Sequence, residues 1–149
     1  MQGATKHLPG TGTIKNANPE VNSSGRTGAL LANGSASLTD ANLTLQASRR
    51  PQGATCLFLC SLGEGSIAAP GDAYGTLCLG APIRRFTASS QVGAAGPNGA
   101  RALDLPLDAF PEGLGTRPVM AGESWYFQAW YRDGAASTFT DSTNVSFLP

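Results

Sequence analysis

The chain has 149 residues and a mass of 15.2 kDa, which predicts a single domain. Only 13% of the residues are charged, and 10 basic residues balance 10 acidic ones. This balance argues against nucleic acid as a partner, which needs a basic surface, and against a polybasic membrane patch. No apolar run is long enough to cross a bilayer, so the sequence predicts no membrane insertion.

Residues 1–25 are polar and rich in Gly, Asn, Ser and Thr, and we interpret them as a flexible N-terminal arm or an edge segment. Residues 26–149 are interpreted as one β-sandwich domain. Short apolar stretches there alternate with turn sequences such as Asn33-Gly34 and Asp133-Gly134. Eight strands are predicted, at 27–32, 43–47, 55–61, 75–79, 83–87, 102–107, 124–132 and 144–148. Their spacing predicts an all-β fold, a single antiparallel two-sheet sandwich resembling a jelly roll.

The stretch 124–132 has the highest aromatic content, so we place it at or near the centre of one sheet. In an extended strand alternate side chains face opposite sides. One set is predicted to face the core: Trp125, Phe127, Ala129 and Tyr131. The other set forms the candidate binding residues: Tyr126, Gln128, Trp130 and Arg132. A mixed aromatic and polar face can stack on sugar rings or form an interface. In the competing interpretation, Tyr126 and Trp130 pack under a loop and Arg132 pairs with Asp133 or Asp141.

Three cysteines occur, at Cys56, Cys60 and Cys78. Cys56 and Cys60 share one strand face, but their Cα atoms would lie about 13 Å apart at roughly 3.3 Å per residue. A disulfide needs Cα atoms within about 7 Å, so these two cannot bridge each other. Two interpretations stay open, namely buried thiols or a disulfide between Cys78 and one of the other two. The spacing does not favour zinc.

Little in the sequence indicates catalysis. His7 is the sole histidine and lies in the polar N-terminal segment, whereas a catalytic imidazole must be held rigidly. Asp133 and Asp141 are candidates for a calcium site or an acid pair, but two carboxylates without a recognisable loop make a weak signal. Of the basic pair Arg84-Arg85, strand alternation predicts that one side chain points outward. We expect no enzymatic activity, no cofactor and no metal site.

Several segments together resemble one family, an uncharacterised β-rich domain of secreted planctomycete and related bacterial proteins. The matching stretches, in chain order and at similar spacing, are 22–25, 34–37, 42–45, Gly75-Thr76-Leu77-Cys78-Leu79-Gly80, 83–86, Gly122–Asp133 with its Trp-Tyr-Phe-Gln-Ala-Trp-Tyr-Arg-Asp run, 139–141 and 145–147. The resemblance covers the chain from about residue 18 onward. It implies a C-terminal module of an exported protein and carries no catalytic residues. Some relatives have a cysteine where this chain has Ala129, and many have one before the Asn22 stretch, where this chain has none.

These observations lead to two hypotheses about function. In the first, the chain is a non-catalytic extracellular module, secreted or at the cell surface, with a structural, surface-assembly or adhesive role. It would bind itself or another cell-surface protein by pairing of strand edges, with the arm 1–25 as an added strand. In the alternative, the chain is a carbohydrate-binding module that uses the aromatic face around Tyr126 and Trp130.

Overall fold

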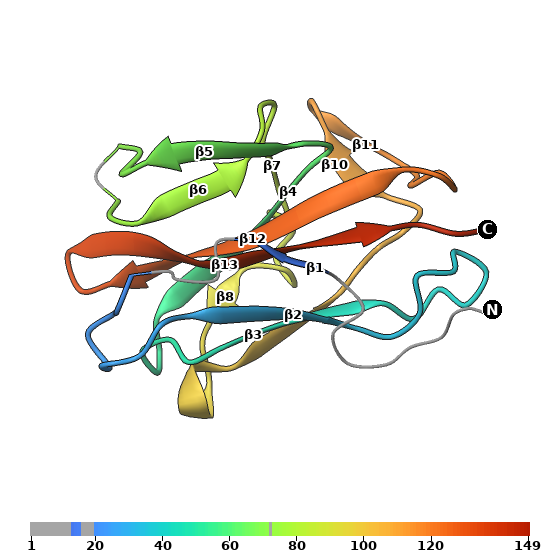
Figure 1. The fold of residues 1–149 in the computed structure, drawn as a ribbon. Helices are drawn as coiled ribbons and strands as arrows, with labels where there is room; N and C mark the ends of the chain where they lie inside the picture. The colour runs from blue at the N-terminus through green and yellow to red at the C-terminus, as the bar shows by residue number, and fades with distance from the viewer. Residues whose placement is uncertain (1–12, 16–19, 72) are drawn as a thin grey trace.

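The computed structural model describes residues 13–15, 20–71 and 73–149, and it confirms the predicted all-β sandwich (Figure 1). Most of the segment 1–19, including His7, lies outside the described residues. Within the described part, no helix has the length and apolar character needed to cross a bilayer.

Two sheets and two separate hairpins make up the described part of the fold, and the strands in each are antiparallel. The larger, six-stranded sheet has the order β1 (Thr13–Lys15), β13 (Ala136–Ser146), β12 (Ser124–Asp133), β4 (Thr55–Ser61), β7 (Arg84–Arg85), and β8 (Gly93–Ala94) also pairs with β4. The smaller sheet has the order β2 (Ala29–Asn33), β3 (Thr44–Ser48), β9 (Arg101–Asp104), preceded by the 3₁₀ turn η1 (Pro97–Gly99). The hairpins are β5 (Glu64–Ala68) with β6 (Thr76–Leu79), and β10 (Phe110–Glu112) with β11 (Gly115–Arg117).

The main core lies between the two sheets. The smaller sheet contributes Leu30 and Leu45, Leu43 packs beside them just before β3, and the larger sheet contributes Trp125 and Phe127, among other buried residues. Leu43 and Leu45 belong to the alternating pattern from which a half-buried strand was predicted. Burial of these side chains is the main driving force for packing the two sheets together.

A third layer covers the other side of the larger sheet, where the β5–β6 hairpin lies over β4, β12 and β13 (Figure 1). Leu77 and Leu79 of β6 pack there with Leu59 of β4 and Phe139 of β13. The central part of the larger sheet is therefore covered on both faces. This explains why β4 has the continuous apolar sequence of a doubly covered strand rather than an alternating one.

Strand β12 lies at the centre of the larger sheet, between β13 and β4, as predicted. Of the strand predicted at 144–148, only residues 144–146 belong to β13, which begins at Ala136 and pairs with β12 across the turn after Asp133. The prediction was wrong about this start because residues 136–143 are mostly Ser and Thr, which resemble a polar loop.

The described stretches before residue 26 contact the rest of the fold. Thr13–Lys15 forms an edge strand that pairs with Ser142–Asn144 of the same chain. Asn22 is buried, and its side-chain amide donates hydrogen bonds to the Arg49 carbonyl and to the Tyr131 hydroxyl, both at 3.0 Å. Residue 22 is thereby tied to the central strand.

Candidate interaction surface

The four candidate binding residues of β12 lie on the face covered by the β5–β6 hairpin, and their exposure differs. Gln128 is fully buried. Its side-chain oxygen accepts a hydrogen bond from the Cys78 amide at 2.8 Å, and its nitrogen donates to the carbonyls of Thr76 and Thr140 at 3.0 and 2.8 Å. Gln128 therefore fastens β6 to the larger sheet, and a ligand would reach it only after the hairpin had moved.

This role predicts a large effect of Gln128→Ala. The substitution leaves a buried amide and two carbonyls without this partner and creates a cavity, so we expect a loss of about 3 kcal/mol in the free energy of unfolding. Urea denaturation of the purified chain measures it. Arg132→Ala, an exposed substitution four residues away on the same face, is the control and should cost less than about 1 kcal/mol. Equal losses in the two variants would contradict the fastening role.

Tyr126 and Trp130 are both half-buried and pack against the apolar cluster under the hairpin. Arg132 is exposed, and its guanidinium carbon lies 5.4 Å from the centroid of the Trp130 ring, within cation–π distance. Arg132 is therefore stacked on Trp130 and covers part of one ring face.

An apolar hollow of about 420 Å³ opens beside Trp130. Its walls come from β4, β6, β12 and β13, with the turn before Ala73 and the residues that lead into β7. The lining residues are mostly apolar: Leu57, Leu59, Pro70, Gly71, Ala73, Leu77, Ile83, Arg85, Trp130, Ser137 and Phe139. We call this the Trp130 hollow. Most of these walls are apolar, and Arg85 is the one charged side chain among the described lining residues. Such a hollow suits a ligand with an apolar group next to an acidic one.

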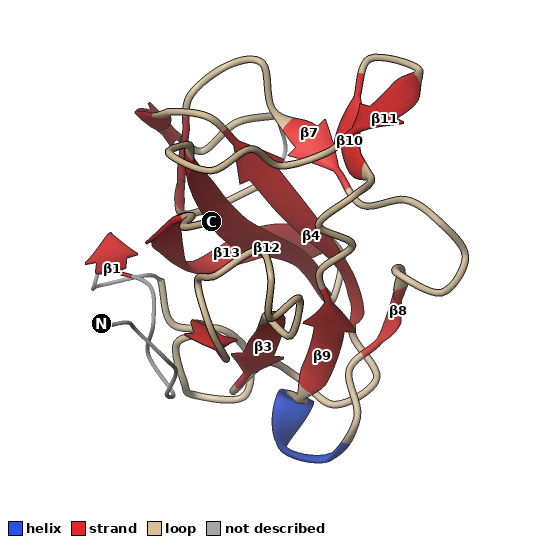
Figure 2. Ribbon diagram, turned by 90° about the vertical axis from the view of Figure 1, so that its right-hand side faces the viewer, coloured by secondary structure: helices blue, strands red, loops and turns tan. Residues whose placement is uncertain are grey.

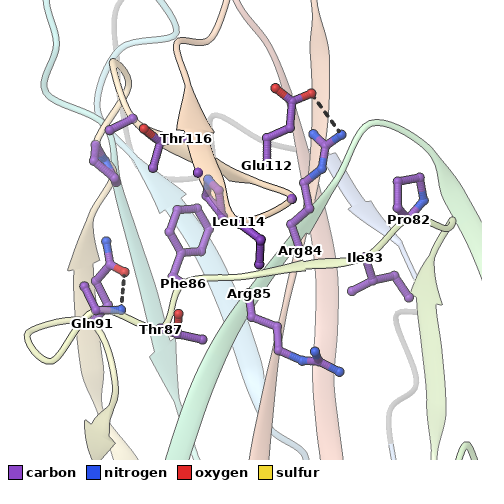
Figure 3. A pocket seen from close by; sticks show the side chains of 16 residues that line it. Pro82, Ile83, Arg84, Arg85, Phe86, Thr87, Gln91, Glu112, Leu114 and Thr116 are labelled. Atoms are coloured by element: carbon purple, nitrogen blue, oxygen red, sulfur yellow. Dashed lines mark hydrogen bonds and ion pairs between the residues drawn. The ribbon is translucent and has the colours of Figure 1, made fainter.

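The basic pair on β7 divides as alternation predicted, with Arg84 partly buried and Arg85 exposed. Arg84 lies over the Trp125 ring, 5.2 Å from its centroid, and forms an ion pair of 3.8 Å with Glu112 of β10. Figure 3 shows Arg84 directed to Glu112 and Arg85 directed to the opposite side of β7. Arg84 thus holds the β10 strand in place, and Arg85 contributes to the surface.

Strand β7 and the β10–β11 hairpin lie beside each other (Figure 2). A second groove, of about 980 Å³, is lined by residues of both (Figure 3). Ile83 and Arg85 line both this groove and the Trp130 hollow. The two depressions are therefore neighbours, divided by the β7 segment. Sequence reasoning could not connect them, because the strand pairing that brings β7 beside β4 is not visible in the sequence.

Leu114, at the tip of the β10–β11 hairpin, is an apolar side chain that the sequence interpretation missed. It is as exposed as a residue in an extended chain, at 110% of the reference value. Two further leucine and isoleucine side chains are also exposed: Leu62, just before β5, and Ile67, within β5.

Asp133 and Asp141, the candidate calcium ligands, have separate structural partners. Asp133 accepts hydrogen bonds from the Ser23 amide and the Tyr74 hydroxyl, and although burial opposes ionisation, these bonds hold the pKa of its carboxyl below the usual range. Asp141 accepts a hydrogen bond from the Leu30 amide at 2.7 Å, which joins β13 to β2. Among the described residues, no cluster of three or more His, Cys, Asp or Glu is placed to hold a metal ion.

Burial raises the pKa of Asp141 to about 6, although the Leu30 amide and the nearby Arg49 charge counteract part of the effect. Because the folded state binds this proton more tightly than the unfolded chain, the contribution of Asp141 to stability falls as the pH rises from about 4 through 6. Asp141→Asn removes this titration and can keep the bond to Leu30. We expect the variant to gain about 1 kcal/mol relative to the parent chain between pH 4 and pH 8, after allowance for solvent screening. Thermal melts across this range measure the difference, and parallel pH profiles for the two proteins would contradict it.

Cys56, Cys60 and Cys78 are buried thiols, which is the first of the two interpretations left open by the sequence. Burial raises the pKa of Cys60 to about 12, against the opposing charge of Arg84. The Cys60 thiol is therefore protonated at neutral pH and chemically unreactive.

Comparison of the chain with protein-family models, with curated proteins and with solved structures gave no match.

Proposed function

We propose that the chain is a non-catalytic module of the cell exterior with a structural role, which assembles by association with further copies of itself. The observation that carries this proposal is the presence of a fully exposed apolar tip, Leu114, and an open apolar hollow that both adjoin the segment Ile83–Arg85. Exposing an apolar tip and leaving an apolar hollow open both cost free energy in water, and association recovers it.

Two acidic side chains, Glu123 and Asp133, accept hydrogen bonds within the fold, which supports a non-catalytic role. Burial opposes ionisation of Glu123, yet its bonds to Arg117, the Met120 amide and the Trp125 indole keep the pKa of Glu123 below the usual range. Asp133 is likewise held by its own hydrogen bonds. These carboxylates act as structural acceptors. The low charge content and the resemblance to exported modules support a place outside the cell.

A carbohydrate-binding module is the second candidate, because Trp130 lines an open hollow. Two features weigh against it. Arg132 stacks on the ring that a sugar would use, and the hollow is lined mainly by apolar side chains rather than by the polar groups that bind hydroxyls. Apolar protein side chains suit this hollow better than a sugar does.

The test is the molar mass of the purified chain in solution, measured by light scattering behind size exclusion over a range of concentrations. Self-assembly predicts a mass that rises above 15.2 kDa as the concentration increases. A constant mass of 15.2 kDa at every concentration would contradict it. A glycan array tests the second candidate, which predicts saturable sugar binding that Trp130→Ala abolishes.

A further inference from the structure

We infer that two copies associate by inserting the β10–β11 tip of one copy, with Leu114, into the Trp130 hollow of the other. This inference rests on the self-assembly proposed above and specifies its contact. The partner is a second copy of this chain, and the recognised group is a leucine side chain next to a carboxylate.

The β10–β11 hairpin, which would supply the inserted side chain, does not use Leu114 to pack against the rest of the chain. Glu112 pairs with Gly115, so Gly113 and Leu114 form a two-residue turn, and Gly113 takes a positive φ of 57° that glycine adopts without strain. The base of the hairpin is held by the buried Phe110. The tip is therefore fixed in position while its leucine is fully exposed.

The acceptor matches this side chain in size and in polarity. Apolar cavities of about 150 Å³ bind a benzene molecule, so the hollow of about 420 Å³ has room for a leucine side chain and part of the turn backbone. Leu57, Leu59, Leu77 and Phe139 offer it aliphatic and aromatic contacts.

Charge complementarity adds a second point of recognition. Glu112 lies two residues before Leu114, and its side chain is half exposed even though it contacts Arg84 at 3.8 Å. Arg85 lines the hollow and is itself exposed. When Leu114 enters the hollow of the partner, Glu112 approaches Arg85 of that copy, and opposite charges meet.

The positions of donor and acceptor on one copy favour a reciprocal dimer. Ile83 and Arg85 line both the hollow and the groove beside the β10–β11 hairpin, so the two elements lie on either side of one short segment. With donor and acceptor this close, a two-fold axis lets each copy insert its tip into the other at the same time.

The first test is Leu114→Asp, studied by sedimentation equilibrium of the full chain. The variant should melt at the temperature of the parent, because Leu114 is exposed, and its self-association should weaken about 30-fold or more, as for an interface hot spot. Met120→Asp, which alters an exposed apolar side chain outside the hairpin, is the matched control and should associate as the parent does. Undiminished association of Leu114→Asp would overturn this contact and leave self-assembly standing. A parent chain that is monomeric throughout would overturn both.

The second test exchanges charges. Arg85→Glu and Glu112→Arg should each weaken self-association, because each places like charges opposite one another across the contact. The double variant should recover association, since the two positions then carry opposite charges again with their signs exchanged. Glu112→Arg also removes the ion pair with Arg84 of its own chain, in the single and in the double variant. Melting temperatures of all three variants therefore control for loosening of the hairpin. A double variant that associates no better than the single ones would overturn the proposed orientation of the tip in the hollow.

Discussion

Phe110→Ala is expected to lower the free energy of unfolding by about 4 kcal/mol, a large part of the roughly 5–15 kcal/mol that stabilises a typical domain. The Phe110 ring is fully buried and lies edge-on to four other rings, the nearest being Trp125 at 4.9 Å and Phe86 at 5.3 Å between centroids. Alanine removes these contacts and leaves a cavity that the surrounding aromatic side chains cannot fill. Urea denaturation followed by tryptophan fluorescence measures the loss.

Phe110→Leu is the matched control, since it keeps an apolar side chain at the site and should cost less than half as much. Because Phe110 also begins β10, the alanine variant should loosen the hairpin and weaken self-association, whereas the leucine variant should retain it. A loss below about 1 kcal/mol in the alanine variant would show that Phe110 does not hold the hairpin to the core.

Gly99→Ala is expected to cost about 3 kcal/mol, and the reason is contact between two backbone segments. Gly99 has a φ of 64°, and a Cβ added there would lie 1.9 Å from the Arg50 carbonyl oxygen. The turn that contains Gly99 also accepts a hydrogen bond from the Arg50 Nε at 2.9 Å. Alanine forces this turn away from the corner between β3 and β4. Thermal and urea denaturation give the free energy.

Gly53→Ala separates the steric effect from backbone strain. Gly53 has a similar φ of 81°, but a Cβ there would meet no atom within 4 Å. This variant should cost only about 1 kcal/mol, the penalty for a positive φ alone. If both variants lost the same amount, the close approach of Gly99 to Arg50 would not be the cause.

The sequence was informative where apolar content and strand period agreed. The bounds of β4 and the central position of β12 followed from their aliphatic and aromatic residues. The first half of β13 was missed because its residues look polar, although Ser137, Thr138 and Thr140 are all buried. Their β-branched or small side chains fit the sheet, and the Thr140 hydroxyl donates to the Asp141 carbonyl. Because hydroxyl side chains are buried on both faces of this strand, the sequence shows no alternation of apolar and polar residues that would predict it.

Strand β5 was missed for the opposite reason, since all its residues are exposed and it has no apolar face to recognise. Its partner β6 was predicted from its apolar run. The hairpin they form is what decides the exposure of the candidate binding residues, burying Gln128 and half-covering Tyr126 and Trp130. Strand alternation correctly placed these side chains on one face but could not reveal the layer above them.

The proposed contact combines residues that are far apart in the chain, so only the fold could assemble it. Arg85 reaches the Trp130 hollow because β7 pairs with β4. Leu114 lies across β7 from the hollow, where Phe110 anchors its hairpin in the core. One local signal was present in the sequence, an isolated leucine between Gly113 and Gly115, where a turn exposes whatever side chain it carries.

The most direct measurement is an isotope-filtered nuclear Overhauser experiment on an equal mixture of labelled and unlabelled chains at high concentration. It detects only protons that are close together across two copies. We predict intermolecular signals between the Leu114 methyl groups of one copy and the Trp130 indole and Leu77 methyl protons of the other. Intermolecular signals confined to other surfaces, or none at a concentration where the molar mass exceeds 15.2 kDa, would contradict association through this hollow.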